Sequence, residues 1–267
     1  MGRSSSTKLF RLFSLHLWGS LPAPVQRAFS KLYSRVYDKS FSRYFIKPYC
    51  SWNYKDPEYL NKFRPASGGD TYQSFQDFFT RVFKDPPKII SEAVWACEGL
   101  LCDYDRVSEL STIKVKGQAM HLRNIFGLGG KEIPDTHYFS NVFLHNNNYH
   151  RIHAPVSGKI DRIEHIPGEL VLLRPWFYPD KPSLPALRNE RLNLDIVDQR
   201  GYKWFLSIVG GPAVGTILLT KGLGLGSEVQ IGQDIAQFLL GSTCCIAGPL
   251  PVENAKVGEQ VEMGQPL

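Results

Sequence analysis

Two histidines stand three residues apart in the sequence, at His150 and His153, with Tyr149 directly before them. Histidine is the usual proton acceptor near neutral pH and a common metal ligand, so the pair indicates a proton-transfer site or part of a metal site. Side chains three residues apart on a strand face opposite sides, so both enter one site only near a strand end or a bend. The alternative is one functional histidine and one that packs in the core.

A serine directly follows a glycine at Gly241-Ser242, ahead of Thr243. A serine hydroxyl in this setting can attack the carbonyl of the residue before it, because glycine places no side chain in the way and tolerates a strained peptide. The same three residues are also typical of an ordinary turn.

Two acidic positions could support such chemistry. Glu98 precedes a glycine at the start of a β-rich region, and a carboxylate can orient a histidine that in turn activates a serine. Taken alone, Glu98 is interpreted as a surface acid. The polar run at residues 189–191 combines an amide, an acid and a base, and its default interpretation is a solvated turn.

Composition narrows the function classes. Lys and Arg number 31 against 25 Asp and Glu, and the formal net charge of +6 allows attraction to an anionic membrane or to nucleic acid. The basic residues are scattered rather than interleaved with aromatic residues, so nucleic-acid binding is not expected. Five cysteines, an odd number without zinc-ligand spacing, predict neither a disulfide scaffold nor a metal site.

The elements that must position these residues fall into three segments, at residues 1–21, 22–87 and 88–267. The first segment mixes apolar residues with Lys8 and Arg11 and contains no acid. That pattern is typical of an amphipathic helix at a membrane surface or of an organelle-targeting segment, and a helix packed on the core is the alternative.

The second segment has a helical pattern. Apolar residues recur at steps of three and four over residues 22–45, which predicts a helix buried on one face. A further helix is expected over residues 71–84, with Thr71 or Ser74 as its cap. In the third segment, short apolar runs alternate with glycine and proline, which favours an antiparallel β domain and an α+β fold overall.

A faint internal repeat lies within the β-rich segment. Four residues recur with identical spacing, as Gly226, Val229, Gly232 and Ile235 and again as Gly258, Val261, Gly264 and Leu267. Residues 96–101 and 154–160 share a second rhythm, a small residue followed by glycine and an apolar residue. Related glycine-turn hairpins of the lipoyl/biotinyl type, packed as a sandwich, would explain both patterns.

Several motifs, taken in this order, resemble the phosphatidylserine decarboxylase family. They are SFQDFFTRVFK (74–84), VKGQAMHLRNIFGL (115–128), YHRIHAPVSG (149–158), NERL (189–192), SIVGGPAVGTI (207–217) and GSEVQIGQDIAQFLLGST (226–243). The resemblance extends from about residue 22 to the end of the chain.

The resemblance implies a proenzyme that cuts itself between Gly241 and Ser242. The two fragments, β (1–241) and α (242–267), would remain in one fold. Ser242 would become a covalent pyruvoyl group, the built-in cofactor, which forms a Schiff base with the substrate amine and accepts the electrons released with CO₂.

The resemblance also assigns roles to the candidate residues. An Asp-His-Ser relay drives the cut in the family, and Glu98, His153 and Ser242 match its positions. His150 is the expected proton donor to the substrate's α-carbon. Two residues depart from the family pattern: Glu98 stands where the family has aspartate, and Asn148 where many relatives have aspartate. Asp103 and Asp105 are nearby substitutes for the relay acid.

The expected function is decarboxylation of phosphatidylserine to phosphatidylethanolamine by a peripheral enzyme of a bacterial cell membrane or a mitochondrial inner membrane. The family is often dimeric, so a homodimer is one expected assembly. Two alternatives stay open: a pyruvoyl-dependent decarboxylase of a soluble amino acid, and a non-catalytic lipid-binding relative in which Glu98 no longer supports the relay.

Overall fold

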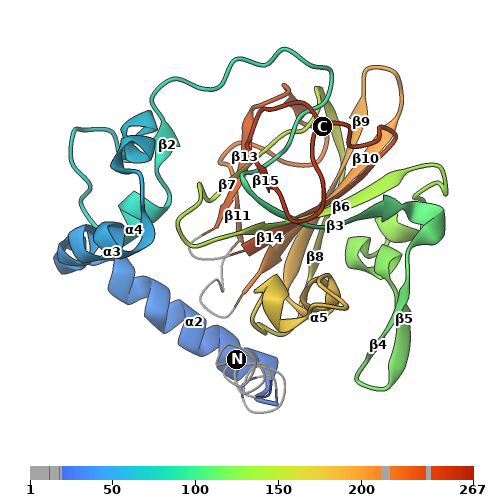
Figure 1. Cartoon of the computed structure of the whole chain (residues 1–267), viewed down its shortest axis with the longest axis horizontal. Coiled ribbons are helices and arrows are strands. Elements are labelled where there is room, and N and C mark those ends of the chain that lie inside the picture. Colours follow the sequence, from blue (N-terminus) through green and yellow to red (C-terminus); the bar gives the residue numbers. More distant parts are fainter. Residues whose placement is uncertain (1–11, 13–17, 19, 212–216, 239–241) are drawn as a thin grey trace.

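A computed structural model describes residues 12, 18, 20–211, 217–238 and 242–267 of the chain. Most of the predicted N-terminal membrane segment and Gly241 lie outside these described residues. Figure 1 shows a helical part joined to a β domain, and the predicted α+β class is confirmed.

The described helices come mainly from the first third of the chain. The α-helices are α2 (Ala23–Asp38), α3 (Ile46–Asn53), α4 (Phe75–Phe79) and α5 (Leu184–Arg188). Short 3-10 helices are η2 (Ser40–Phe45), η3 (Pro57–Lys62), η4 (Val107–Glu109), η5 (Leu122–Phe126), η6 (Gly129–Lys131) and η7 (Pro175–Phe177).

The described strands form one large sheet and three small ones. They are β1 (Phe63–Arg64), β2 (Val82–Phe83), β3 (Gly99–Arg106), β4 (Thr112–Val115), β5 (Gln118–His121), β6 (Tyr138–Leu144), β7 (Arg151–His153), β8 (Gly158–Ile166), β9 (Arg191–Asp198), β10 (Lys203–Gly210), β11 (Ile217–Leu219), β12 (Glu228–Val229), β13 (Asp234–Phe238), β14 (Ser242–Gly248) and β15 (Gln260–Val261).

Helix α2 buries polar residues and exposes its apolar residues, which is the opposite of the prediction. Its buried residues are the polar Gln26 and Ser30, whereas Phe29 and Leu32 are 55% and 60% exposed. Gln26 is held inside because its side chain bonds the backbone oxygen of Trp18 and accepts a hydrogen bond from the Leu170 amide. The predicted helix is therefore present, but its apolar stripe faces outward.

The helix expected over residues 71–84 is shorter than predicted. Ser74 caps it, since its Oγ accepts a hydrogen bond from the Asp77 amide at 3.1 Å, but α4 ends at Phe79. Thr80 leaves the helical conformation, and Val82 and Phe83 pair instead with β1. Sheet pairing overrides the helical pattern in the second half of this segment.

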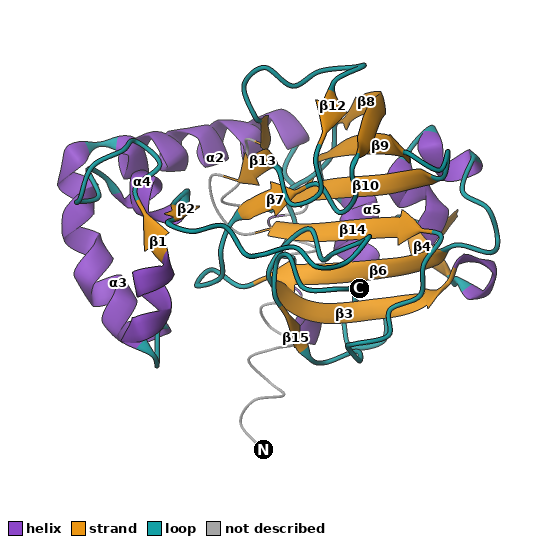
Figure 2. Cartoon of the chain, turned by 90° about the horizontal axis from the view of Figure 1, so that it is seen from above, coloured by secondary structure: helices purple, strands orange, loops and turns teal. Residues whose placement is uncertain are grey.

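The large sheet is antiparallel and has the strand order β12-β8-β9-β10-β14-β6-β3-β15. Strand β14 lies near its middle, with β10 on one side and β6 on the other. Figure 2 shows the helical part to one side of this sheet. Within the described residues, no helix has the length and hydropathy needed to cross a bilayer.

Both faces of the large sheet are buried, and β14 alternates between two cores. Cys244 belongs to the core that also contains residues of β7, β13 and α4, whereas Cys245 belongs to the core beneath α5 and η5. Neighbouring side chains on a strand point to opposite faces, which explains why both thiols are buried and unpaired. By the same alternation, Ser242 shares the face of Cys244.

The internal repeat marks the two edges of the large sheet. Val229 in β12 pairs with Gly158 on one edge, and Val261 in β15 pairs with Gly99 on the other. A Cβ atom at either of these glycines would collide with a backbone carbonyl of the adjacent strand. The repeat thus corresponds to two equivalent glycine-dependent edges, which close opposite ends of one sheet.

Candidate active site

Ser242 is the first residue of β14, and it is completely buried. Its backbone pairs with Gly210 of β10 and Leu144 of β6. Its Oγ has no hydrogen-bond partner among the described residues. A buried hydroxyl normally has a partner, and one without a partner costs free energy, so this position carries a feature that packing alone does not explain.

His150 precedes β7 and is also completely buried. Its Nδ1 lies 2.8 Å from the backbone oxygen of Asn148. A carbonyl oxygen only accepts hydrogen bonds, so Nδ1 carries the proton and Nε2 is left with a free lone pair. That Nε2 has no partner among the described residues.

The main chain brings His150 close to the strand that leads to the serine. The Phe238 amide donates to the His150 oxygen at 3.1 Å, and Phe238 ends β13 four residues before Ser242. The imidazole packs on Phe79 with a ring separation of 4.0 Å, within the core that also contains Cys244. A proton-accepting nitrogen and a hydroxyl, both without partners, therefore share one side of the sheet.

Burial keeps the His150 imidazole neutral. It lowers the pKa of His150 to about 3, and the positive charge of Arg81 adds to this effect. Near neutral pH the ring is therefore a base with an available lone pair, not a cation.

His153 lies at the far end of β7, opposite Asp234 of β13. Its Nδ1 lies 2.7 Å from the Gly232 oxygen, and its Nε2 lies 2.9 Å from the Tyr149 hydroxyl. Burial lowers the pKa of His153, so the neutral ring uses Nδ1 to donate and Nε2 to accept. Both ring nitrogens are occupied, one by a backbone turn and the other by Tyr149.

Glu98 is half-buried, and its carboxylate forms no direct hydrogen bond to His150 or to His153. The Tyr59 hydroxyl donates to its two carboxylate oxygens at 2.7 and 2.8 Å, and Asn148 Nδ2 donates to Oε1 at 2.5 Å. The backbone oxygen of the same Asn148 holds the ring of His150. The structure thus connects the carboxylate to His150 through one intervening residue.

Arg81, which was not among the predicted site residues, supports the same loop from inside the protein. It is completely buried, and its Nη2 donates to the backbone oxygens of Asn147 and Asn148 at 3.2 and 2.9 Å. Its guanidinium also lies over the Phe63 ring, 4.7 Å from the centroid. Arg81 lies in the motif SFQDFFTRVFK (74–84), which is the sequence feature that could have identified it.

Asp103, the substitute acid, reaches the opposite side of β14. Ser183 Oγ donates to Asp103 at 2.6 Å, Asn141 Nδ2 donates to Ser183 at 3.0 Å, and Thr243 Oγ1 donates to Asn141 at 2.5 Å. Burial raises the pKa of Asp103. This chain of hydrogen bonds fixes Thr243, the residue after Ser242, and involves no histidine.

The interpretation of residues 189–191 as a solvated turn is wrong. Asn189 is completely buried, and its Nδ2 donates to the Gly210 oxygen at 2.7 Å. Gly210 is the β10 partner of Ser242. Arg191 is also buried and donates to the Ile125 oxygen at 2.7 Å, so this run positions the end of β10 next to the candidate serine.

Comparison with known proteins assigns the family. A family model described as phosphatidylserine decarboxylase matches residues 75–267, which is more than half of the chain. The chain belongs to the phosphatidylserine decarboxylase family. The resemblance found in the motifs is thereby confirmed, and the family is one of carboxy-lyases.

Curated relatives of this family resemble much of the chain. The phosphatidylserine decarboxylase proenzyme of Methylobacillus flagellatus is 28% identical over 201 residues, which are 67% of this chain and 70% of that protein. The proenzyme of Polaromonas naphthalenivorans is 27% identical over 226 residues, 74% of this chain and 77% of that protein. The proenzyme of Psychrobacter arcticus is 25% identical over 279 residues, 95% and 89% of the two chains.

Proposed function

We propose that this protein is a proenzyme that cuts itself between Gly241 and Ser242 and then converts phosphatidylserine to phosphatidylethanolamine. The observation that carries the proposal is the buried Ser242 hydroxyl, which has no partner in the described part of the chain. It lies on the side of the sheet where the His150 Nε2 also lacks one. The relatives named as phosphatidylserine decarboxylase proenzymes support the same activity.

The cut balances without an external reagent other than water. Ser242 Oγ loses its proton to a base and bonds to the Gly241 carbonyl carbon, and the peptide C–N bond breaks to leave an ester and an amine. Loss of the Ser242 α-proton then breaks the Cβ–O bond and releases the Gly241 carboxylate, and the enamine that remains at position 242 tautomerises to an imine. Water adds at the resulting imine carbon and ammonia departs, which leaves a pyruvoyl group at position 242.

Two histidines compete for the role of base. The family resemblance implies His153, whereas the hydrogen bonds favour His150, because its Nε2 is bare and the His153 nitrogens are both occupied. Glu98 and Asn148 would act as positioning residues that hold the His150 tautomer.

The surroundings of residue 242 fit a pyruvoyl group. Formation of the group removes the Oγ atom, which has no hydrogen bond to any of the described residues. The group would supply a carbonyl that withdraws electrons from the substrate carbon as CO₂ leaves. His150 Nε2, on the same side of the sheet, would take up and return a proton during the reaction.

Membrane contact is part of the proposal, because phosphatidylserine lies in a bilayer. The outward apolar face of α2, with Phe29, Leu32 and Val36, is suited to contact the membrane surface, and so is Trp52 in α3, which is 92% exposed. The protein would be a peripheral membrane enzyme, and a homodimer remains the assembly that the family suggests.

The first test is the intact mass of purified protein beside a Ser242→Ala variant. We expect two fragments in the wild type, one that ends at Gly241 and one that begins with a blocked residue 242, and a single chain in the variant. A wild type that stays full-length after long incubation would contradict self-cleavage and indicate a non-catalytic relative.

A matched pair of variants then separates the two bases. We expect His150→Asn to abolish the cut and His153→Asn to slow it less; the reverse order would assign the base to His153. Release of CO₂ from phosphatidylserine vesicles, compared with free serine, decides between a lipid and a soluble substrate.

A further inference from the structure

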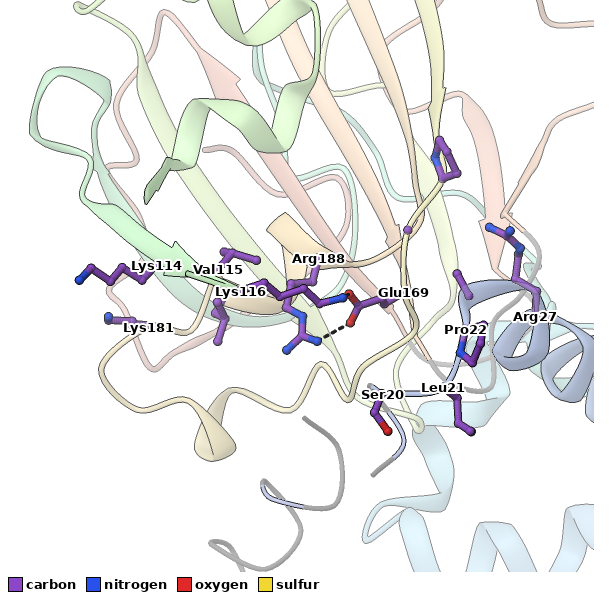
Figure 3. A pocket seen from close by; sticks show the side chains of 14 residues that line it. Ser20, Leu21, Pro22, Arg27, Lys114, Val115, Lys116, Glu169, Lys181 and Arg188 are labelled. Atoms are coloured by element: carbon purple, nitrogen blue, oxygen red, sulfur yellow. Dashed lines mark hydrogen bonds and ion pairs between the residues drawn. The ribbon is translucent and has the colours of Figure 1, made fainter. Parts of the chain in front are cut away.

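A cavity of about 940 Å³ lies apart from Ser242, between the start of α2, the β4–β5 hairpin and α5 (Figure 3). None of the predicted site residues lines it. Its walls include Leu21 and Pro22 from the helical part, Lys116 at the hairpin tip and Arg188 at the end of α5. The cavity therefore joins the helical part to the β domain at a place that the proposed chemistry does not use.

The lining of this cavity is strongly basic. Five of its side chains are cationic and one, Glu169, is acidic; the cations are Arg27, Lys114, Lys116, Lys181 and Arg188. Glu169 forms ion pairs with both Lys116 and Arg188, so one carboxylate is shared between two cations. The walls therefore carry an excess of positive charge that suits a multiply charged anion such as phosphate.

Lys114 and Lys181 are the cations best placed to meet a ligand. Figure 3 shows their side chains together at one end of the cavity, with Arg27 at the other end. Both lysines are exposed, and no ion pair to either is recorded among the described residues. Arg27, in contrast, lies 3.5 Å from Glu190.

The helix that forms one wall of the cavity also carries the outward apolar side chains further along its length. Pro22 and Ala23, at the start of the helix, line its wall, and Phe29 and Leu32 follow along the same helix with 55% and 60% exposure. A basic pocket beside an exposed apolar helix matches a ligand with an anionic head and apolar chains. Free phosphate would use the cations but not the helix.

We propose that this cavity binds the phosphate-bearing head group of an anionic phospholipid, whose acyl chains lie against α2. The site would anchor the protein on an anionic bilayer and is separate from the candidate active site at Ser242. Because a lipid without a serine head group should also bind, the proposal can be tested without turnover.

The test is co-sedimentation of the full chain with vesicles of phosphatidylcholine that contain phosphatidylglycerol. The variant is Lys114→Glu/Lys181→Glu, and the control is Lys221→Glu/Lys256→Glu, two exposed lysines outside the cavity. Each double substitution lowers the formal net charge of +6 by the same amount. We expect the cavity variant to lose about tenfold or more in vesicle affinity and the control to change much less.

Other outcomes would overturn the proposal. An equal loss in both double variants would mean attraction by net charge alone, and no loss in either would mean that the cavity is not an anion site. Inorganic phosphate can be added to the same assay as a competitor. If it displaces the protein from the vesicles as strongly as added competitor vesicles do, the cavity would be assigned to a free phosphate compound. Self-cleavage measured on the same samples reports separately on the proposed function, because both doubles should still be cut.

Discussion

The tautomer of His150 is the most consequential detail at the scale of single residues. The Asn148 carbonyl fixes the proton on Nδ1, so the lone pair of Nε2 remains inside the protein, where burial keeps the ring neutral. A side chain that is held in one orientation loses little entropy when it takes up a proton, which favours a base of this kind. The positioning role proposed for Glu98 rests on its hydrogen bond to that same asparagine.

We expect Glu98→Ala and Asn148→Ala each to slow self-cleavage, by about a hundredfold, because either change loosens the ring of His150. Since both act through one hydrogen-bonded unit, the double variant should be about as slow as either single variant. The measurement is the rate of fragment formation by intact mass. Glu262→Ala is the control. Glu262 and Glu98 both line two further cavities, so this variant removes an acid from the same place. Additive losses would show that Glu98 acts independently of Asn148.

The pH dependence of stability follows from the same burial. The pKa of His150 falls from 6.5 in the unfolded chain to about 3 in the fold, so between these values the unfolded state binds a proton that the folded state does not. The free energy of unfolding should therefore decrease as the pH falls through this window and be fully retained above it. Denaturant titrations should show a shallower decrease for His150→Asn, and an unchanged slope would contradict the neutral buried ring.

The sequence could predict candidate site residues, but not how hydrogen bonds connect them. The histidine pair, Ser242 and Glu98 were all selected from spacing and motif. The intermediates Tyr59 and Arg81 were not, because they come from the helical part and meet the site only through tertiary packing. Asn148 departs from the family pattern, and its hydrogen bonds to both Glu98 and His150 explain its position.

At the scale of elements, the pattern of α2 predicted the helix and not the direction of its apolar face. Periodicity identifies one apolar stripe but does not say whether protein, lipid or a partner covers it. The buried polar side chain of Gln26 determines the direction here, by bonding across to Leu170. The sequence also did not predict the length of α4, because the pairing of β2 with β1 ends this helix.

The outward face of α2 gives a prediction for membrane binding. Phe29→Ser/Leu32→Ser should weaken binding to lipid vesicles by about tenfold or more, because each large apolar side chain contributes about 1.5–3 kcal/mol when it leaves water. Thermal stability should change little, because both positions are exposed. The matched control is Leu225→Ser/Val257→Ser, two apolar residues that are 72% and 57% exposed outside α2. Equal losses in both doubles would exclude α2 as the contact.

At the scale of the whole molecule, the proposed cut would divide the strands of the large sheet between two fragments and leave their pairing in place. The fragment 242–267 supplies β14 between β10 and β6, and β15 at the edge next to β3. All seven residues of β14 are buried. We therefore expect the two fragments to co-elute in native gel filtration and to separate only in denaturant; elution of a free small fragment under native conditions would contradict this arrangement.

The repeat shows what the sequence can predict at this scale. Spacing alone identified Gly226 and Gly258 as equivalent, and both have positive φ, at 82° and 96°. It could not show that the two copies close opposite edges of one sheet, because that depends on which distant strands, β8 and β3, they join.

The central position of β14 also makes maturation a one-way step for folding. Before the cut, β14 reaches its place as part of one chain, so its pairing with β10 and β6 is independent of protein concentration. After the cut, a denatured enzyme would have to recapture from solution a separate peptide that begins at residue 242 and contains β14 and β15. Its recovery would become second-order and compete with aggregation. The lifetime of the mature enzyme is then set by the rate at which it first unfolds.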